Sequence, residues 1–202
     1  MPIQHAIWKV SERPVPLPET RLVSESFLEK MIVQDSSILS ERWMLIGQQV
    51  RTRHGGIIDL LALNADGQLI IIELKKAQTP REVVSQALDY ASWAEDLEAD
   101  EIAAIYNRYS NGASLDDAFQ QRFGLPLDEE QLNDTHQIVI VASSLDLSTE
   151  RIVNYLNSKD FAINVIFFQV FQDGEAQYLS RSWLIDPVET ESKAVSASSG
   201  PK

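Results

Sequence analysis

The sequence predicts an α/β protein in which helices flank a mixed β-sheet. Two observations indicate this class. The apolar pattern first gives a helix, then three strands in succession, then more helix and a fourth strand. A further helix and two strands follow, which we interpret as a C-terminal αββ extension. A meander bracketed by helices, with a crossover to another strand, implies one mixed sheet with helices packed against it.

The composition is that of one globular domain without cysteine. The chain has 202 residues, which is enough for one sizeable domain with a core or for two very small ones, and 44% hydrophobic and 23% charged residues are an ordinary globular composition. The absence of cysteine excludes disulfides and thiolate metal sites. Charges interrupt every apolar run, and the first residues show no secretory signal pattern. We therefore expect no membrane association and a cytoplasmic location.

The chain starts with an arm and a helix. Four prolines among residues 1–19 favour an extended arm, and we place one domain over residues 20–186. Apolar side chains at roughly helical spacing predict a helix over residues 24–34. These side chains are Leu22, Phe27, Leu28, Met31 and Ile32.

Three strands come next, joined by two turns. The predicted strands cover residues 42–52, 57–64 and 68–76. Glycines in the sequences HGG, at 54–56, and ADG, at 65–67, permit the backbone angles that tight turns require. The second turn therefore indicates that the second and third strands form a hairpin.

The second helix has a clear start signal. Thr79 can cap a helix, Pro80 suits the first helical position, and Glu82 completes a capping box. We expect this helix to continue to residue 96 or close to it. The remaining predicted elements are helices over 99–110, 114–123 and 148–160, a buried strand over 137–144, and a hairpin of strands over 163–173 and 176–185.

The last residues differ from the rest in composition. Residues 187–202 are mostly small and polar, with few side chains that could join a core. Such a segment buries too little apolar surface to offset its loss of conformational entropy. We therefore predict a disordered tail over residues 187–202.

The third strand carries charges where a buried strand should not. Five of the six residues from Leu69 to Leu74 are apolar, yet Glu73 and Lys75 point to the same side. Burying both charges is costly unless they pair or meet a metal. A hairpin register centred on Asp66 places Asp59 near Glu73.

Two neighbouring carboxylates point to metal chemistry. They repel each other unless one is protonated or a cation bridges them. Oxygen ligands without cysteine or histidine suit Mg²⁺ or Mn²⁺. Lys75 could then orient or deprotonate a metal-bound water. Two pairs of residues at helical spacing lie on faces that could reach this site: Gln86 with Tyr90, and Glu25 with Glu29.

These residues together resemble a known superfamily. Glu25, Asp59, the sequence Glu73-Leu74-Lys75, and Gln86 with Tyr90 are similar to the motifs of the PD-(D/E)XK nucleases. The RecB-type and NucS-like branch is most similar to the stretch GGIIDLLALNADGQLIIIELKKAQTPREVVSQALDYASWA. The resemblance is strong over residues 22–93 and weaker over 137–184.

The resemblance implies a fold, an activity and a set of roles. The fold is the restriction-endonuclease-like αβββαβ core, and the activity is metal-dependent cleavage of DNA, by an endonuclease or exonuclease of DNA repair or defence. Asp59, Glu73 and Glu25 would bind Mg²⁺ or Mn²⁺, with Glu29 a less favoured substitute for Glu25. Lys75 would assist the attacking water, and Gln86 and Tyr90 would steady the site and the substrate.

The charge distribution restricts how DNA could bind. The net charge of −13 and the pI of about 4.6 have the wrong sign for a protein that coats nucleic acid. Cationic residues nevertheless gather between positions 42 and 81. We predict contacts to the DNA backbone from five of the residues in and around this interval: Arg51, Arg53, His54, Lys76 and Arg81.

Other interpretations stay open. The chain could be a catalytically silent nuclease-like module that binds nucleic acid or a protein partner, because its net charge is acidic. It could also be a structural α/β protein in which Glu73 and Lys75 form a buried ion pair. Gln86 and Tyr90 could be ordinary surface hydrogen-bonding residues, and a homodimer is also open.

Overall fold

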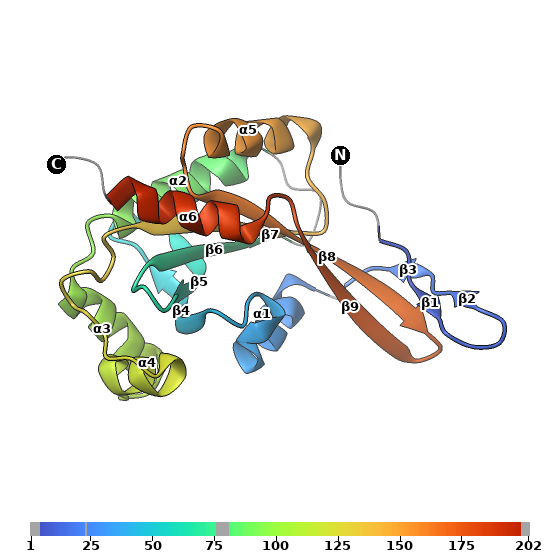
Figure 1. The fold of residues 1–202 in the computed structure, drawn as a ribbon, viewed down its shortest axis with the longest axis horizontal. Helices are drawn as coiled ribbons and strands as arrows, with labels where there is room; N and C mark the ends of the chain where they lie inside the picture. The colour runs from blue at the N-terminus through green and yellow to red at the C-terminus, as the bar shows by residue number, and fades with distance from the viewer. Residues whose placement is uncertain (1–4, 23, 76–80, 199–202) are drawn as a thin grey trace.

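The computed structural model describes residues 5–22, 24–75 and 81–198 and confirms the α/β class. Figure 1 shows a sheet with helices packed around it. In chain order the elements are β1 (Trp8–Lys9), β2 (Val15–Pro16), β3 (Glu19–Thr20), α1 (Glu25–Gln34), η1 (Ser36–Ile38), β4 (Met44–Arg51), β5 (Ile57–Leu63), β6 (Leu69–Lys75), α2 (Glu82–Ala94), α3 (Ala99–Tyr109), α4 (Leu115–Phe123), β7 (His136–Ala142), α5 (Leu147–Asn157), β8 (Ile163–Asp173), β9 (Ala176–Trp183) and α6 (Pro187–Ser198).

The main sheet is mixed, as predicted. Within the described residues its strands lie in the order β3-β8-β7-β6-β5-β4, and β9 pairs with β8. Strands β4, β5 and β6 form the antiparallel meander. Strands β6, β7 and β8 run parallel to one another, and β9 returns antiparallel to β8. The helical crossovers that precede β7 and β8 permit this parallel arrangement.

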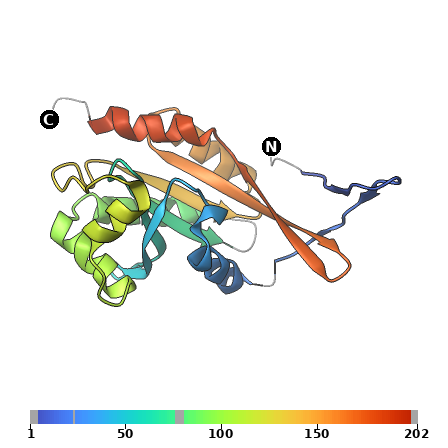
Figure 2. The same ribbon diagram turned by 60° about the horizontal axis from the view of Figure 1, so that its bottom comes forward.

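Strand β6 lies in the middle of the sheet, and both of its faces are covered. Ile71 packs in one core cluster, with side chains of α2, α3, α4 and α5. Ile72 packs in the other cluster, together with Leu28 and Ile32 of α1. Figure 2 shows α1 and α5 on opposite sides of the sheet. This burial on two faces explains why the strand reads as a continuous apolar run.

The first two main helices begin differently. Ser24 caps α1, since its hydroxyl accepts a hydrogen bond from the Phe27 N–H at 3.0 Å. This confirms the helix predicted over residues 24–34. Helix α2 is described from Glu82 onward. The start signal predicted at Thr79 and Pro80 lies outside the described residues.

The N-terminal arm is extended but carries short strands. Strands β1 and β2 pair with each other, and β3 adds to β8. Lys9 forms an ion pair with Asp173 at 2.8 Å, which ties the arm to the tip of the β8–β9 hairpin. Figure 1 shows this hairpin and the arm extending from the end of the sheet away from α3 and α4.

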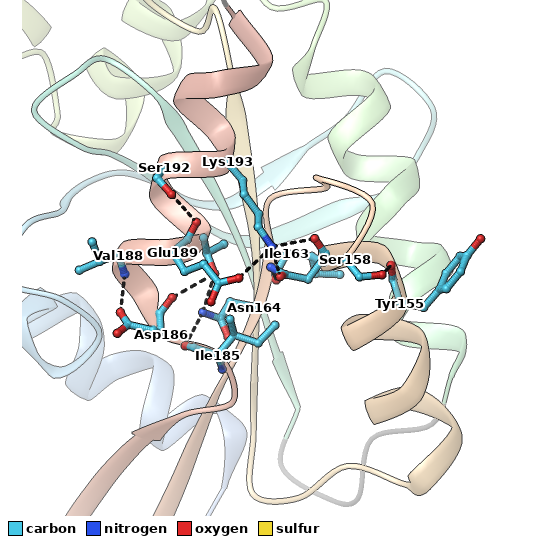
Figure 3. A network of polar contacts seen from close by, with 12 residues as sticks. Tyr155, Ser158, Ile163, Asn164, Ile185, Asp186, Val188, Glu189, Ser192 and Lys193 are labelled. Atoms are coloured by element: carbon cyan, nitrogen blue, oxygen red, sulfur yellow. Dashed lines mark hydrogen bonds and ion pairs between the residues drawn. The ribbon is translucent and has the colours of Figure 1, made fainter.

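The prediction of a disordered tail over residues 187–202 is wrong for residues 187–198, which form α6. Figure 3 shows the polar network around this helix. The Asn164 side-chain amide donates to the Ile185 carbonyl at 2.9 Å and to the Thr190 hydroxyl at 3.0 Å. Lys193 donates to the Asn157 carbonyl at 2.8 Å. These contacts are distant in sequence, so the local composition did not reveal them.

None of the helices in the described residues combines the length and the apolar character that a membrane span requires.

Candidate active site

Three adjacent strands bring three polar residues into one row across the sheet. Strand β4 pairs Gln48 with Leu60 and Val50 with Ile58, so Gln49 lies opposite Asp59. Strand β5 pairs residues 60–63 with 72–69, which confirms the predicted register centred on Asp66. Continued by one residue, this register sets Asp59 opposite Glu73.

Both oxygens of the Asp59 carboxylate are held. Its Oδ2 accepts a hydrogen bond from the Leu74 N–H at 2.8 Å, and its Oδ1 accepts one from the Gln49 amide at 3.1 Å. Burial raises the pKa of Asp59, although these two hydrogen bonds and the charge of Lys75 act in the opposite direction. The carboxylate is thus anchored to both neighbouring strands.

Glu73 and Lys75 form a close ion pair at the end of β6. Lys75 Nζ lies 2.6 Å from Glu73 Oε1, and the Glu73 side chain is only 2% exposed. Its second oxygen, Oε2, is buried and has no hydrogen-bond partner. The pKa of Glu73 is raised to about 7, and burial is the main cause. The charge of Asp59 also raises this pKa, whereas the hydrogen bond from Lys75 lowers it.

Lys75 stays a cation in this arrangement. Burial lowers the pKa of Lys75, but its hydrogen bond to Glu73 and the charges of Glu73, Asp59 and Glu25 outweigh this effect, so the pKa is raised. The Lys75 side chain keeps 30% of its surface exposed. An ammonium that is open to solvent beside a buried carboxylate can reach a phosphate or a water molecule.

The two acidic residues of α1 face different parts of the row. The charge of Glu25 raises the pKa of Glu73, so Glu25 lies on the side of the ion pair. Glu29 Oε1 accepts hydrogen bonds from the side chains of Gln48 at 3.0 Å and Gln49 at 2.9 Å. The choice between Glu25 and Glu29 as a metal ligand stays a prediction.

Gln86 and Tyr90 anchor α2 to the beginning of β5. The Gln86 amide donates to the Tyr90 hydroxyl at 2.7 Å, and the Ile57 N–H donates to the same hydroxyl at 3.3 Å. The Tyr90 ring is buried and lies against Gly56, where an added Cβ would come within 2.5 Å of its Cε1. This contact lies three residues before Asp59 in the chain.

Asp59 and Glu73 offer carboxylate oxygens that suit a hard cation such as Mg²⁺. Glu73 Oε2 is a buried oxygen without a hydrogen-bond partner, and the charge of the Asp59 carboxylate is close enough to raise the pKa of Glu73. No three His, Cys, Asp or Glu side chains of the described residues already form a metal site. Mg²⁺ does not need one, because it is commonly held by one or two carboxylates together with waters and substrate phosphate. Asp59 and Glu73 fit that mode of binding.

Two of the residues predicted to contact DNA have acidic neighbours. Arg53 pairs with Asp96 at 2.6 Å, and Arg81 lies 3.5 Å from Glu82. All four of these side chains are exposed, so the pairs are weak and screened by salt.

The other residues predicted to contact DNA are Arg51, His54 and Lys76. Arg51 ends β4, His54 lies in the turn after it, and both are exposed. Neither makes an ion pair with another described residue. Lys76 lies outside the described residues. Arg51 and His54 are therefore the predicted contacts that the fold leaves uncompensated.

Sequence reasoning missed Gln49. The residue sits in the left-handed region of the backbone, with φ of 50°, inside a strand. A hairpin register about the turn at His54 would have found it, because Gln49 and Asp59 lie equally far from that residue.

A cavity elsewhere in the molecule has no part in this row. Its volume is about 890 Å³, and it is lined by residues of α2, of the segment 133–136 and of the segment 159–162. It lies at the amino end of β7, whereas Glu73 and Lys75 are at the carboxyl end of β6. Asp59, Glu73 and Lys75 are not among its lining residues.

Comparison with known proteins identifies similar sequences. Residues 24–107 match the family described as the endonuclease NucS C-terminal domain. An endonuclease NucS from Pyrococcus horikoshii is 24% identical over 82 residues, which cover 41% of this chain and 32% of that protein.

Two solved structures also match, with low TM-scores. A repair endonuclease from Pyrococcus abyssi has a TM-score of 0.42 and 15% identity, over 75% of this chain and 62% of that one. An EndoMS–dsDNA complex has a TM-score of 0.44 and 14% identity, over 80% of this chain and 64% of that one.

The residues matched by the family contain the candidate site. It includes Asp59, Glu73 and Lys75, together with Glu25 and the pair on α2. The chain spans less than two thirds of the length of these relatives, and only 32% of the curated NucS. Over residues 24–107 this chain is therefore similar to the C-terminal domain of endonuclease NucS, which confirms the resemblance to a NucS-like nuclease.

Proposed function

We propose that this chain is a metal-dependent DNA nuclease, which hydrolyses phosphodiester bonds in DNA repair or defence. The observation that carries the proposal is the row of Asp59 and Glu73, with Lys75 beside it, at the end of a rigid central strand. Its support from relatives is that the matching family and the curated relative are named endonucleases, and that EndoMS is described in a complex with double-stranded DNA.

In this proposal Asp59 and the free Oε2 of Glu73 hold Mg²⁺ or Mn²⁺, with Glu25 as a further candidate. The cation, when bound, supplies polarisation of the scissile phosphate and a more acidic water. The strands do the positioning, because Leu74 N–H fixes Asp59 and the buried core on both faces fixes Glu73. No flexible loop separates the two carboxylates from the sheet.

Lys75 contributes charge next to the reacting phosphate. Its ammonium hydrogen bonds to Glu73, and its exposed part faces solvent. From there it can orient the attacking water and stabilise negative charge that develops on the phosphate. Gln86 and Tyr90 keep α2 and the beginning of β5 in register with this site.

The same proposal assigns DNA contacts to exposed groups near the turn. Arg51 and His54 are available to phosphates, and Arg53 can exchange Asp96 for a phosphate because their pair is exposed. The net charge of −13 restricts binding to such a local patch. A cytoplasmic location and assembly as a homodimer or with a protein partner stay predictions.

The test is cleavage of labelled single-stranded, double-stranded, flapped and mismatched DNA with Mg²⁺ or Mn²⁺, and with chelator as the blank. Variants of similar shape, Asp59→Asn, Glu73→Gln and Lys75→Met, should each lose about 10²–10⁴ in rate. The exposed Glu130→Gln variant is the matched control and should cut normally. Cleavage that persists in all three site variants would refute the proposal.

A second candidate is the catalytically silent module. The observation in its favour is the net charge of −13, which has the wrong sign for a protein that must hold a DNA substrate. It predicts that DNA or a protein partner binds while Mn²⁺ does not, and that no substrate is cut. Mn²⁺ binding that is abolished in Asp59→Asn would exclude it.

A further inference from the structure

We propose that Gln49 is a positioning residue, which sets the orientation of the Asp59 carboxylate before a metal binds. The inference deepens the proposed function and rests on it. The strand pairs on either side place Gln49 opposite Asp59, and its side chain hydrogen bonds to that residue, so the row across the sheet is Gln49, Asp59 and Glu73. The glutamine is thus part of the same structure as the two carboxylates.

The backbone at Gln49 is unusual for its residue type. Its φ of 50° is left-handed, a conformation that L side chains with a Cβ rarely adopt. Glycine would occupy this position with less strain. Strained residues of this kind gather at functional sites, where the surrounding structure holds them in place. A glutamine here therefore needs a reason that lies in its side chain.

The side chain supplies that reason by joining two carboxylates. The Gln49 amide nitrogen donates to Glu29 Oε1 at 2.9 Å and to Asp59 Oδ1 at 3.1 Å. An amide NH₂ has two hydrogens, and both are used. One neutral group thus links α1 to β5 and offsets the repulsion between two acidic side chains.

The chemistry of an amide suits a position beside a cation site. A lysine or arginine at residue 49 would also bridge the carboxylates, but its positive charge would repel a divalent ion. The amide donates hydrogen bonds without that charge. With Leu74 N–H on Oδ2 and Gln49 on Oδ1, the plane of the Asp59 carboxylate is fixed at both oxygens.

The adjacent residue provides a matched control. Gln48 is also a glutamine of β4, is also exposed, and also donates to Glu29 Oε1, at 3.0 Å. It makes no hydrogen bond to Asp59. Replacing Gln48 removes the same chemical group from the same strand and leaves the Asp59 carboxylate held by Gln49.

The experiment measures Mn²⁺ binding by electron paramagnetic resonance, without DNA, and in parallel the metal concentration that gives half-maximal cleavage. We expect Gln49→Ala and Gln49→Gly to weaken Mn²⁺ binding by about 10- to 100-fold, the usual effect of removing a group that orients a metal ligand. Gln48→Ala should bind Mn²⁺ as the wild type does.

Thermal denaturation separates positioning from folding. Gln49→Gly relieves the left-handed backbone, so its midpoint should not fall below that of the wild type even though Mn²⁺ binding is weaker. If Gln49 had only a structural role, Mn²⁺ affinity would weaken only in variants whose denaturation midpoint also falls. Wild-type Mn²⁺ affinity in Gln49→Gly, or an equal loss in Gln48→Ala, would overturn the assignment of Gln49.

The outcomes for the two proposals are distinct. A wild-type chain that binds Mn²⁺ and cuts DNA, together with an unaffected Gln49→Gly, overturns the role of Gln49 alone. A wild-type chain that binds Mn²⁺ more tightly than Gln49→Gly but cuts nothing overturns the nuclease and leaves the role of Gln49 in ordering a metal site. Absence of Mn²⁺ binding in the wild type overturns both.

Discussion

The buried carboxyl of Glu73 should make the stability of the metal-free protein depend on pH near neutrality. Its pKa is raised from an ordinary value of 4.5 to about 7, mainly by burial. Between these pH values the folded state therefore keeps a proton that the unfolded state has lost. The free energy of unfolding must fall as the pH rises through this window.

The magnitude follows from the two pKa values. Ionising Glu73 in the folded protein, relative to the unfolded chain, costs about 3 kcal/mol when the pKa moves from 4.5 to about 7. About 2 kcal/mol of this falls between pH 5.5 and pH 8. That range also keeps the chain away from its pI of about 4.6, where its net charge is small.

The comparison is between the wild type and Glu73→Gln, which has similar shape but no proton to lose. Urea unfolding in the presence of chelator, followed by the fluorescence of buried Trp43, gives the free energy at each pH. The wild type should lose about 2 kcal/mol more than Glu73→Gln across this range. Titrating groups that do not interact with Glu73 are common to both proteins and cancel. Parallel stability curves would refute the assignment of a raised pKa to Glu73.

Metal should reverse this loss. A cation on ionised Glu73 replaces the missing proton, so Mn²⁺ at about 100 times its dissociation constant should raise the stability of the wild type at pH 8 by about 2.7 kcal/mol. Glu73→Gln should gain much less. Equal stabilisation of the two proteins would show that the cation binds elsewhere.

Three further predictions concern other parts of the structure. Arg51→Ala should weaken DNA binding for all sequences and reduce the slope of log affinity against log salt by about 0.7–0.9 in a fluorescence anisotropy titration, with a smaller change for Arg53→Ala, because that residue is already paired. Gly56→Ala should destabilise the fold by about 1–3 kcal/mol in urea, because the new methyl group overlaps the Tyr90 ring; unchanged stability would show that the ring moves freely. Asn164→Ala should release α6 and speed hydrogen exchange in it, since the amide links the strand to that helix; unchanged exchange would mean that apolar contacts hold α6.

Most of the fold was predictable because its information is local. A hairpin register follows from the centre of its turn, and the turn at Asp66 was enough to set Asp59 opposite Glu73. Helix α6 was not predictable in this way. Its segment is small and polar, and what orders it is the side chain of Asn164, more than twenty residues earlier on a buried strand.

The candidate site shows the same division. Asp59, Glu73 and Lys75 are visible in the sequence, because charged residues are conspicuous in an apolar strand. Gln49 is not conspicuous, since a glutamine in an exposed strand position is ordinary. Only the left-handed φ and the two hydrogen bonds, to different elements, distinguish it from Gln48.

The burial of Glu73 also explains why the site belongs on β6. A carboxylate at the surface would remain ionised and solvated, and it would bind a divalent cation weakly because water competes. At 2% exposure Glu73 has one oxygen committed to Lys75 and one with no partner, so its ionised form is destabilised until a second cation arrives. The core on both faces of β6 prevents the strand from moving so that water could solvate the Glu73 carboxylate. A strand at the edge of the sheet could turn outward and satisfy the same carboxylate with solvent, and the drive to bind metal would be lost.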